Sequence, residues 1–293
     1  MPSGIILKGI GGFYYVRADN DEVYECKARG IFRKDEITPL PGDIVSLTII
    51  DENNKKGSID KIHERHSQLI RPAVANVNQV IIVLSIKSPA PDLLLLDKLL
   101  VMAEHQNIDA IVCINKIDLV SAEEYSKIYE AYSKAGYKVI PLSTKTGEGL
   151  DQLKKSLNGR ISVLAGQSGV GKSTILNRII NSQIMKTGNI SEKIERGRHT
   201  TRHAELVRVE KEGYLVDTPG FSSLGIANIK YDELALYYRE FENYMEGCRF
   251  TRCSHVNEPQ CGIKDAVSKG LIDTGRYERY ISLYNSLKQQ KQY

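Results

Sequence analysis

The chain has 293 residues, of which 41% are hydrophobic and 26% charged, and its formal net charge is +4 at pH 7. This length predicts two or three domains, and the composition is typical of an ordinary soluble globular protein. No apolar run approaches the roughly 20 residues that a membrane-spanning helix needs. The N-terminal stretch has no convincing signal-peptide cleavage site, so we expect a cytoplasmic protein. Such a small net charge gives little support by itself for a nucleic-acid partner.

The first predicted domain, residues 1–67, consists of about five short strands separated by turns rich in Gly, Pro, Asp and Asn. The strands are GIILKGI, GFYYVRA, EVYECKA, DIVSLTII and GSIDKIHE. Five strands without a helical pattern favour a small barrel of the OB-fold type, a fold that often binds oligonucleotides. The alternative is another small β-barrel that docks onto a protein.

The second predicted domain, residues 68–224, alternates buried strands with helices. Its strands include VNQVIIVLSI, DAIVCIN, YKVIPLS and RISVLAG, and a strand pair follows in HAELVRVEKEGYLVD. Continuous apolar strands between helices predict a mainly parallel sheet covered on both faces. The third predicted domain, residues 225–293, reads as helices over 231–246, 263–272 and 275–293, with a cluster of Cys and His after the first. The fold class is therefore multidomain α/β.

A phosphate-binding loop is indicated by GQSGVGKS, which fits G-x-x-x-x-G-K-[ST] and lies between a predicted strand and a predicted helix. Its glycines allow backbone N–H groups to close around phosphates, and the helix N-terminus favours an anion. Lys172 is expected to reach the β- and γ-phosphates, and Ser173 to ligate Mg²⁺. The expected nucleotide contacts are Gly166, Gln167, Ser168, Gly169, Val170, Gly171, Lys172, Ser173 and Thr174.

The stretch LVDTPG ends the predicted strand pair. There Asp217 is expected to hold Mg²⁺ through water, and Gly220 to offer its N–H to the γ-phosphate.

The stretch NKID ends a buried strand and indicates a reader of guanine. The carboxylate of Asp118 can accept hydrogen bonds from the ring N–H and the exocyclic amine of guanine, a pair that adenine lacks. Asn115 would tie the loop together, and the stem of Lys116 would cover the base. A second base-contacting loop is expected in PLSTKTGEG, and its candidates are Ser143, Thr144 and Lys145.

A metal site is indicated by the spacing C-x₄-C-x-H-x₅-C. Three thiolates and one imidazole match a closed tetrahedral zinc site, which we interpret as structural. The alternative is a set of reduced cysteines in a loop. The expected ligands are Cys248, Cys253, His255 and Cys261. The flanking basic residues, which could touch RNA, are Arg249, Arg252 and Lys264.

The motifs occur in an unusual order, because both base-reading loops precede the phosphate loop. Together with the N-terminal barrel and the C-terminal Cys/His module, this order resembles the ribosome small-subunit-dependent GTPase A (RsgA) family. The resemblance covers the whole chain and is carried by NKID, GQSGVGKST, RHTTR, DTPG and the Cys/His spacing. It implies an OB-fold, a circularly permuted P-loop GTPase domain and a zinc domain. It further implies a GTPase that binds rRNA late in the maturation of the 30S subunit and is stimulated by that subunit. We expect a monomer.

The residue that positions the attacking water is not obvious. Ras-type GTPases use a Gln shortly after the Asp-x-x-Gly motif, whereas Phe221 follows Gly220 here. In the loop GRHTTRH, Thr200 or Thr201 is the expected sensor of Mg²⁺ and the γ-phosphate, and the family resemblance slightly favours Thr201. His199 either orients water or faces RNA. Arg198 and Arg202 could neutralise charge, but contacts with RNA phosphates are favoured. We therefore expect slow intrinsic hydrolysis that a partner stimulates.

Two other functions stay open at this point: a GTP-responsive RNA-binding protein with incidental turnover, and a translation factor on elongating ribosomes. The permuted order has one further implication. The chain runs from DTPGFSS directly into the Cys/His module, so we expect the nucleotide state to be coupled to the orientation of that module.

Overall fold

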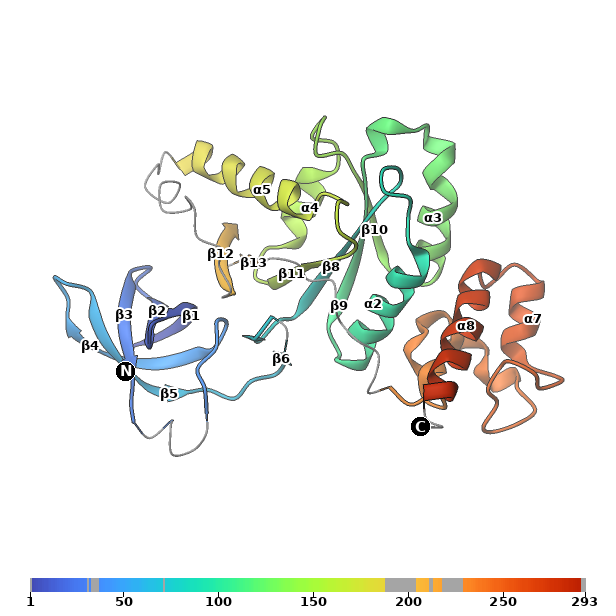
Figure 1. Ribbon diagram of the computed structural model, residues 1–293, viewed down its shortest axis with the longest axis horizontal. Coiled ribbons are helices and arrows are strands. Elements are labelled where there is room, and N and C mark those ends of the chain that lie inside the picture. The colour runs from blue at the N-terminus through green and yellow to red at the C-terminus, as the bar shows by residue number, and fades with distance from the viewer. Residues whose placement is uncertain are drawn as a thin grey trace. The chain divides into compact units, whose positions relative to one another are not determined.

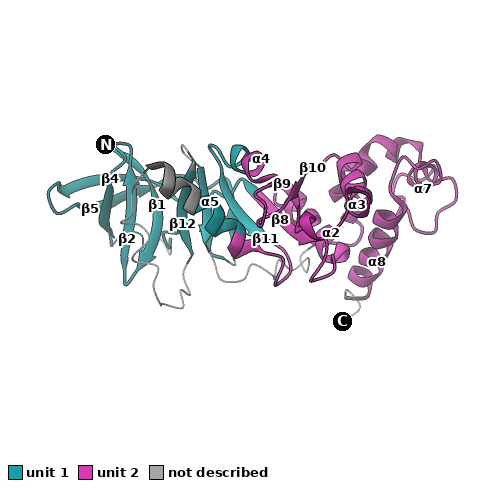
Figure 2. Ribbon diagram, turned by 90° about the horizontal axis from the view of Figure 1, so that it is seen from above, with its two compact units in different colours: residues 1–79, 154–164, 175–221 teal, residues 80–153, 165–174, 222–293 magenta. Residues whose placement is uncertain are grey.

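The computed structural model describes residues 2–30, 32, 37–70, 72–187, 204–210, 213–217 and 229–290. Figure 1 shows its elements coloured along the chain. The chain divides into two compact units, drawn in different colours in Figure 2. Unit 1 comprises residues 1–79, 154–164 and 175–221, and unit 2 comprises residues 80–153, 165–174 and 222–293. None of the helices within the described ranges is long and apolar enough to cross a membrane.

Within the described part of unit 1, five strands close into a barrel in the order β1-β2-β3-β5-β4. The strands are β1 (Ser3–Ile10), β2 (Phe13–Ala18), β3 (Val23–Ala28), β4 (Ile44–Asp51) and β5 (Lys56–Ile62). Alternate residues point inward, so a compact apolar core forms from Ile6, Val16, Tyr24, Leu47 and Ile59, among others. The parallel pairing of β3 with β5 completes the closure, while the neighbouring pairs are antiparallel. The predicted OB-fold is confirmed.

A six-stranded sheet, counted over the described residues, has the order β10-β9-β8-β11-β13-β12. Its strands are β8 (Gln79–Ser85), β9 (Asp109–Asn115), β10 (Lys138–Leu142), β11 (Ile161–Ala165), β12 (Glu205–Glu210) and β13 (Gly213–Asp217). The pairs β9–β10 and β11–β13 are parallel, and β12 is an antiparallel edge strand. The mainly parallel sheet is therefore as predicted. A short pair, β6 (Gln68–Leu69) and β7 (Val74–Ala75), lies between barrel and sheet in the sequence.

Helices separate most of these strands, as the predicted alternation requires. They are α2 (Leu93–His105), the 3₁₀ turn η1 (Ile117–Leu119), α3 (Ala122–Lys134), α4 (Leu150–Ser156) and α5 (Lys172–Thr187). Asp92 starts α2, because its carboxylate accepts the backbone N–H of Leu95 at 2.9 Å. Ser121 and Glu124 start α3 through a reciprocal capping box. These caps fix the two helices that flank β9 in sequence.

The C-terminal module contains η2 (Leu234–Tyr237), η3 (Arg239–Gly247), α7 (Gly262–Ser268) and α8 (Thr274–Gln290). The predicted α-helix over 231–246 is wrong, because this stretch forms the two 3₁₀ segments η2 and η3. Ala235, Tyr238 and Phe241 are all buried at a spacing of three residues. Ala235 lies in η2 and Phe241 in η3, while Tyr238 joins the two segments in an extended conformation. They pack into a core with Tyr280 and Leu283 of α8.

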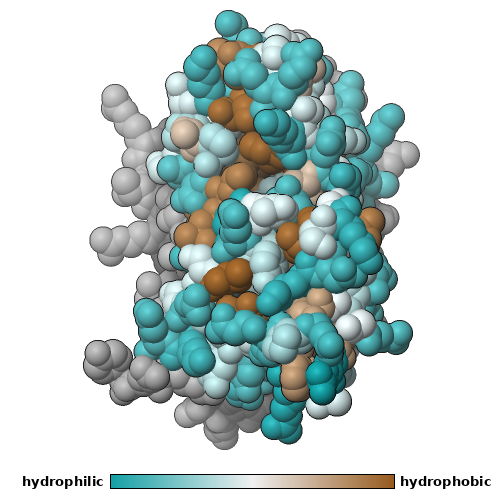
Figure 3. All heavy atoms as spheres, turned by 90° about the vertical axis from the view of Figure 1, so that its right-hand side faces the viewer, coloured by the Kyte–Doolittle hydropathy of each residue, from teal (hydrophilic) through white to brown (hydrophobic). Residues whose placement is uncertain are grey.

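Figure 3 shows the face that carries α7 and α8, where brown apolar side chains form a broken band among hydrophilic ones. Exposed large apolar residues of the module include Leu236, Phe250 and Leu271. Most of its other apolar side chains are buried in the shared core. The module therefore has a real, though small, hydrophobic interior.

Candidate functional site

The predicted phosphate loop connects β11 to α5 and depends on glycine at two close approaches. A Cβ on Gly166 would lie 2.1 Å from the carbonyl oxygen of Val83, and φ at Gly166 is +129°. A Cβ on Gly171 would lie 2.5 Å from Nδ2 of Asn115, and φ there is +102°. Any side chain at these positions would push the loop away from its neighbours. The glycines thus allow the backbone to curl tightly ahead of α5.

Lys172 is the first residue of α5, and its amino group lies over the loop. Nζ donates to the carbonyl oxygens of Gly166 and Gln167, at 2.7 Å each. Burial lowers the pKa of Lys172. A negatively charged phosphate oxygen beside Nζ would oppose this effect, because it favours the charged form of the amine. Val170 is buried, while Ser168, Gly169, Ser173 and Thr174 are exposed. The exposed part of the loop is free to meet a ligand.

The first base-reading loop contacts the phosphate loop inside unit 2. Asn115 is buried, and its Nδ2 donates to the carbonyl oxygen of Val170 at 2.8 Å. Lys116 adopts a left-handed conformation with φ of 66°, and its Nζ donates to the carbonyl oxygens of Gly169, at 2.9 Å, and Ser88. The structure brings the predicted residues Asn115 and Lys116 to the phosphate loop. It adds Ser88, which sequence reasoning missed and whose only signal was the turn residue Pro89 that follows it. Lys116 thereby connects two loops.

The second base-reading loop follows β10 and meets Asp118. The hydroxyl of Ser143 donates to Oδ1 of Asp118 at 2.6 Å. The backbone N–H of Thr144 donates to Oδ1 of Asn115 at 3.4 Å. Asp118 and Lys145 are exposed, whereas Ser143 is fully buried. This arrangement presents an oriented carboxylate to solvent beside the phosphate loop, as a guanine reader requires.

The predicted magnesium and switch residues are only partly described. Asp217 ends β13 and is half-buried. His199, Thr201 and Gly220, like Arg198, Arg202 and Phe221, lie outside the described residues.

The four predicted metal ligands converge. One ligand atom from each of Cys248, Cys253, His255 and Cys261 lies within 4.8 Å of all the others. Sγ of Cys248 is 3.8 Å from Sγ of Cys261, and Nδ1 of His255 is 3.5 and 3.4 Å from those two sulfurs. Zn–S bonds of about 2.3 Å at tetrahedral angles give S···S edges of about 3.8 Å. The donor set and its spacing therefore fit a closed zinc site.

The chain around this cluster is held by groups that the sequence did not reveal. Glu258 accepts the backbone N–H groups of Ser254, at 2.8 Å, and of Val256, at 3.2 Å. Burial would raise the pKa of Glu258, but these hydrogen bonds outweigh it and lower the pKa to about 2. The hydroxyls of Tyr277 and Tyr280 donate to the carbonyl oxygens of His255 and Ser254, each at 2.7 Å. Burial lowers the pKa of His255, which favours the neutral imidazole that ligates metal.

Unit 1 carries a separate open groove of about 860 Å³ beside the barrel. Its lining includes the basic or titratable side chains Arg17, His63, His66 and Arg208, together with Asp19 and Asp21. Arg208 of β12 pairs with Asp21 of the barrel at 2.6 Å, and Arg17 pairs with the same carboxylate at 3.1 Å. The groove is therefore polar and has mixed charge.

Comparison with known proteins agrees with this architecture. The RsgA GTPase family matches residues 62–227, and the RsgA N-terminal domain family matches residues 3–59. "Small ribosomal subunit biogenesis GTPase RsgA" of Ruminiclostridium cellulolyticum is 55% identical over 295 residues, which cover 100% of this chain and 96% of that protein. The protein of that name from Alkaliphilus metalliredigens is 52% identical over 293 residues, which cover 100% of both chains.

Two solved structures are similar over nearly the whole chain. YjeQ from Thermotoga maritima has a TM-score of 0.83 and 36% identity, with 98% of each chain covered. YloQ, described as a circularly permuted GTPase, has the same TM-score and identity, with 99% of this chain and 96% of that chain covered. The chain therefore belongs to the RsgA family of circularly permuted, GTP-hydrolysing P-loop proteins.

Proposed function

We propose that this GTPase acts late in the maturation of the small (30S) ribosomal subunit, where it binds rRNA and is stimulated by the subunit. The observation that carries the proposal is the hydrogen bond from Ser143 to Asp118, which orients the carboxylate that we propose to read guanine. It occurs in a chain 52–55% identical over its full length to proteins named for small-subunit biogenesis. We expect the protein to act in the cytoplasm as a monomer.

In this proposal GTP lies along the surface formed by the phosphate loop and the two base-reading loops. Lys172 and backbone N–H groups of the loop hold the phosphates, while Asp118 selects guanine. The proposed contacts are Asn115, Lys116, Asp118, Ser143, Thr144, Lys145, the loop residues 166–174, Asp217 and Gly220. Ser173 directly, and Asp217 through water, would hold Mg²⁺. Bound Mg²⁺ would neutralise the charge that develops on the phosphates.

Slow intrinsic hydrolysis follows from the absence of a Gln after Gly220, where the sequence has Phe221. We propose that Thr201 senses the γ-phosphate and that His199 orients the attacking water once the subunit has positioned its loop. The groove and the Cys/His module, with Arg249, Arg252 and Lys264 near its ligands, would supply the contacts with rRNA. The four ligands Cys248, Cys253, His255 and Cys261 would hold one structural zinc ion. The chain that follows Gly220 would couple the γ-phosphate to this module.

A single-turnover assay with and without purified 30S subunits tests the proposal. We expect slow hydrolysis by the protein alone and an increase of about 100-fold or more with the subunit. Fast hydrolysis without subunits would overturn it. His199→Ala should abolish most of the stimulation while leaving co-sedimentation with the subunit intact. If stimulated turnover is unchanged, His199 faces RNA and has no part in the chemistry.

Sedimentation separates this function from a role in elongation. With a non-hydrolysable GTP analogue the protein should migrate with free 30S subunits, and with GDP it should leave them. Migration with polysomes would instead support a translation factor.

A further inference from the structure

Helix α8 carries two pairs of polar side chains with different partners. Tyr277 and Tyr280 donate to carbonyl oxygens of the metal-ligand loop. Arg276 and Arg279, from the same turns, bind Asp97 of α2. Helix α8 therefore contacts both the loop that carries the metal ligands and helix α2.

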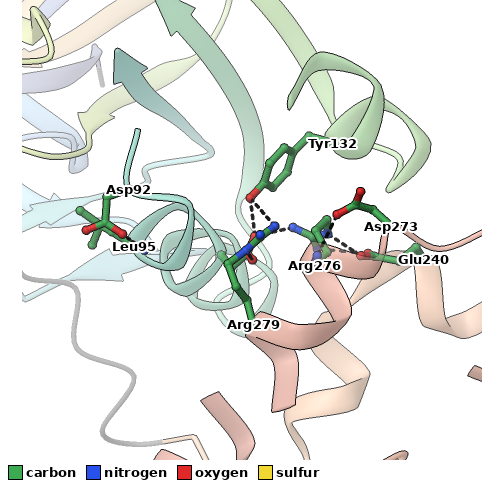
Figure 4. Close-up of polar contacts among 8 residues, drawn as sticks. Asp92, Leu95, Tyr132, Glu240, Asp273, Arg276 and Arg279 are labelled. Carbon is green, nitrogen blue, oxygen red and sulfur yellow. Dashed lines mark hydrogen bonds and ion pairs between the residues drawn. The ribbon is translucent and has the colours of Figure 1, made fainter. Parts of the chain in front are cut away.

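The contact with α2 is buried and specific (Figure 4). Arg276 is 1% exposed, and its Nη1 donates to Oδ1 of Asp97 at 2.6 Å. Its Nε donates to Oε1 of Glu240 at 2.5 Å. Arg279 donates to Oδ2 of Asp97 at 2.5 Å, and the hydroxyl of Tyr132 of α3 donates to Oδ1 at 2.7 Å. The two cations balance the two anions, so this cluster is stable only when every partner stays in place.

Helix α2 in turn lines the phosphate loop. Leu95, Leu96 and Leu99 bound a small cavity together with Gly166, Gln167 and Val170. Asp97 lies within this run of leucines, so an axial shift of α2 would change both contacts at once. A change in the position of α8 that displaced α2 would therefore be felt at the phosphate loop.

Beside the same N-terminal turns of α8, the metal loop has little regular structure of its own. The main-chain carbonyls of Ser254 and His255 accept the two tyrosine hydroxyls. The imidazole of His255 packs edge-on against the ring of Phe241, with 5.9 Å between the ring centroids. Closing the four ligands around a metal ion would lock this main chain, and with it the hydroxyl partners on α8.

We propose that α8 links the metal site to the nucleotide site, so that a bound metal ion and a bound guanine nucleotide strengthen each other's binding. The inference rests on the proposed nucleotide and metal sites. It does not involve the γ-phosphate, so GDP suffices to show it. Coupling of this kind is reciprocal: the factor by which zinc raises the affinity for GDP equals the factor by which GDP raises the affinity for zinc.

The test measures both factors on the full-length protein under reducing conditions. The affinity for a fluorescent GDP analogue is measured with zinc bound and after stripping by a chelator. The affinity for zinc is measured in a chelator buffer with and without saturating GDP. We expect both factors to agree and to be about tenfold. Two nearly isosteric variants, Tyr277→Phe and Asp97→Asn, should still bind zinc and GDP. In each of them we expect both coupling factors to fall toward one.

The control is Lys269→Gln, which removes an exposed ion pair with Asp265 in the same module and touches neither α2 nor the metal ligands in the contacts of the described residues. It should keep the full coupling. Two factors near one in the wild type, with tight binding of both ligands, would overturn the coupling and leave the proposed function intact. Failure to bind zinc or GDP at all would overturn the proposed sites and the coupling with them. Equal coupling in wild type, Tyr277→Phe and Asp97→Asn would exclude α8 as the route.

Discussion

The hydroxyl of Ser143 donates to the carboxylate of Asp118 across 2.6 Å, while the backbone N–H groups of Lys145 and Thr146 donate to the same hydroxyl oxygen at 3.2 and 3.1 Å. These bonds fix the hydroxyl rotor and hence one oxygen of the carboxylate. A hydrogen bond to a charged group contributes about 1.5 kcal/mol or more. In the proposed nucleotide site, Ser143 would therefore act on the base through Asp118.

We predict that Ser143→Ala lowers the affinity for GDP by about tenfold or more. It should also narrow the preference for GDP over inosine diphosphate, because inosine lacks the exocyclic amine that Asp118 reads. Fluorescence titration with both nucleotides measures the effect. Ser126→Ala, which removes an exposed hydroxyl on α3, is the matched control. Equal losses in the two variants would contradict the prediction.

The second prediction concerns Gly171, where an added Cβ would meet the amide of Asn115. Gly171→Ala should displace Asn115 from Val170 and abolish nucleotide binding, as judged by calorimetric titration with GDP. Gly159→Ala provides the control, since φ there is +66° but no atom lies within 4 Å of the added Cβ. That variant should lose about 1–2 kcal/mol of stability and keep its affinity for GDP. Retained binding in Gly171→Ala would show that the loop tolerates a different path.

The cysteines should fall into two classes of reactivity. Burial raises the pKa of Cys26 to about 11 and that of Cys113 to about 12. In the folded protein at pH 8 neither should react with iodoacetamide. The metal cysteines should react only after a chelator is added, so mass spectrometry should find three labelled sites. Labelling of Cys26 in folded protein would contradict the assigned burial.

The same thiols predict how stability changes in alkali. An unfolded chain releases the thiol proton near the ordinary value of 9.0, whereas folded Cys26 holds it to about 11. The unfolded state therefore binds fewer protons above pH 9, and stability falls as the pH rises through that range. Cys26→Ser or Cys26→Ala should reduce this slope in urea titrations between pH 8 and 10. If the dependence of stability on pH is the same in these variants as in the wild type, a group other than Cys26 is responsible for it.

The buried ion cluster predicts a large effect on stability. Arg276→Met leaves Asp97 and Glu240 without their shared cation, at a cost of about 3–5 kcal/mol. The thermal unfolding of unit 2 should shift to a clearly lower temperature by differential scanning calorimetry. Lys269→Met, which breaks only an exposed pair with Asp265, should shift it by less than one degree or so. Similar shifts in the two variants would show that the cluster contributes little.

Most of the fold could be predicted because its elements have strong local patterns. The buried run of β8 and the alternation in β1 to β5 identify their strands without any partner. The stretch 231–246 was predicted as one helix from apolar residues at both three- and four-residue spacings, but it forms two 3₁₀ segments packed in a core with α8. Local pattern alone therefore does not decide between the two helix types here.

The candidate sites divide in the same way. Motif spacing identified the phosphate loop and the four metal ligands, since their chemistry requires residues close in sequence. It did not identify Asp97, a carboxylate within an apolar run whose partner Arg276 lies 179 residues further along. Nor did it identify Tyr277, whose role depends on how α8 lies against the metal loop. Contacts between segments that are far apart in the sequence produce no short motif, so a search for motif spacing does not find them.

The permuted order also affects how the protein is made. Asn115 leaves the ribosome 55 residues before Val170, whose carbonyl oxygen accepts its buried amide. At about 5–20 residues per second, the growing chain carries a base-reading loop for several seconds before any phosphate loop exists. Until the phosphate loop has been made, the nascent chain therefore has no complete pocket for cellular GTP. Only a polypeptide elongated past its midpoint can acquire nucleotide.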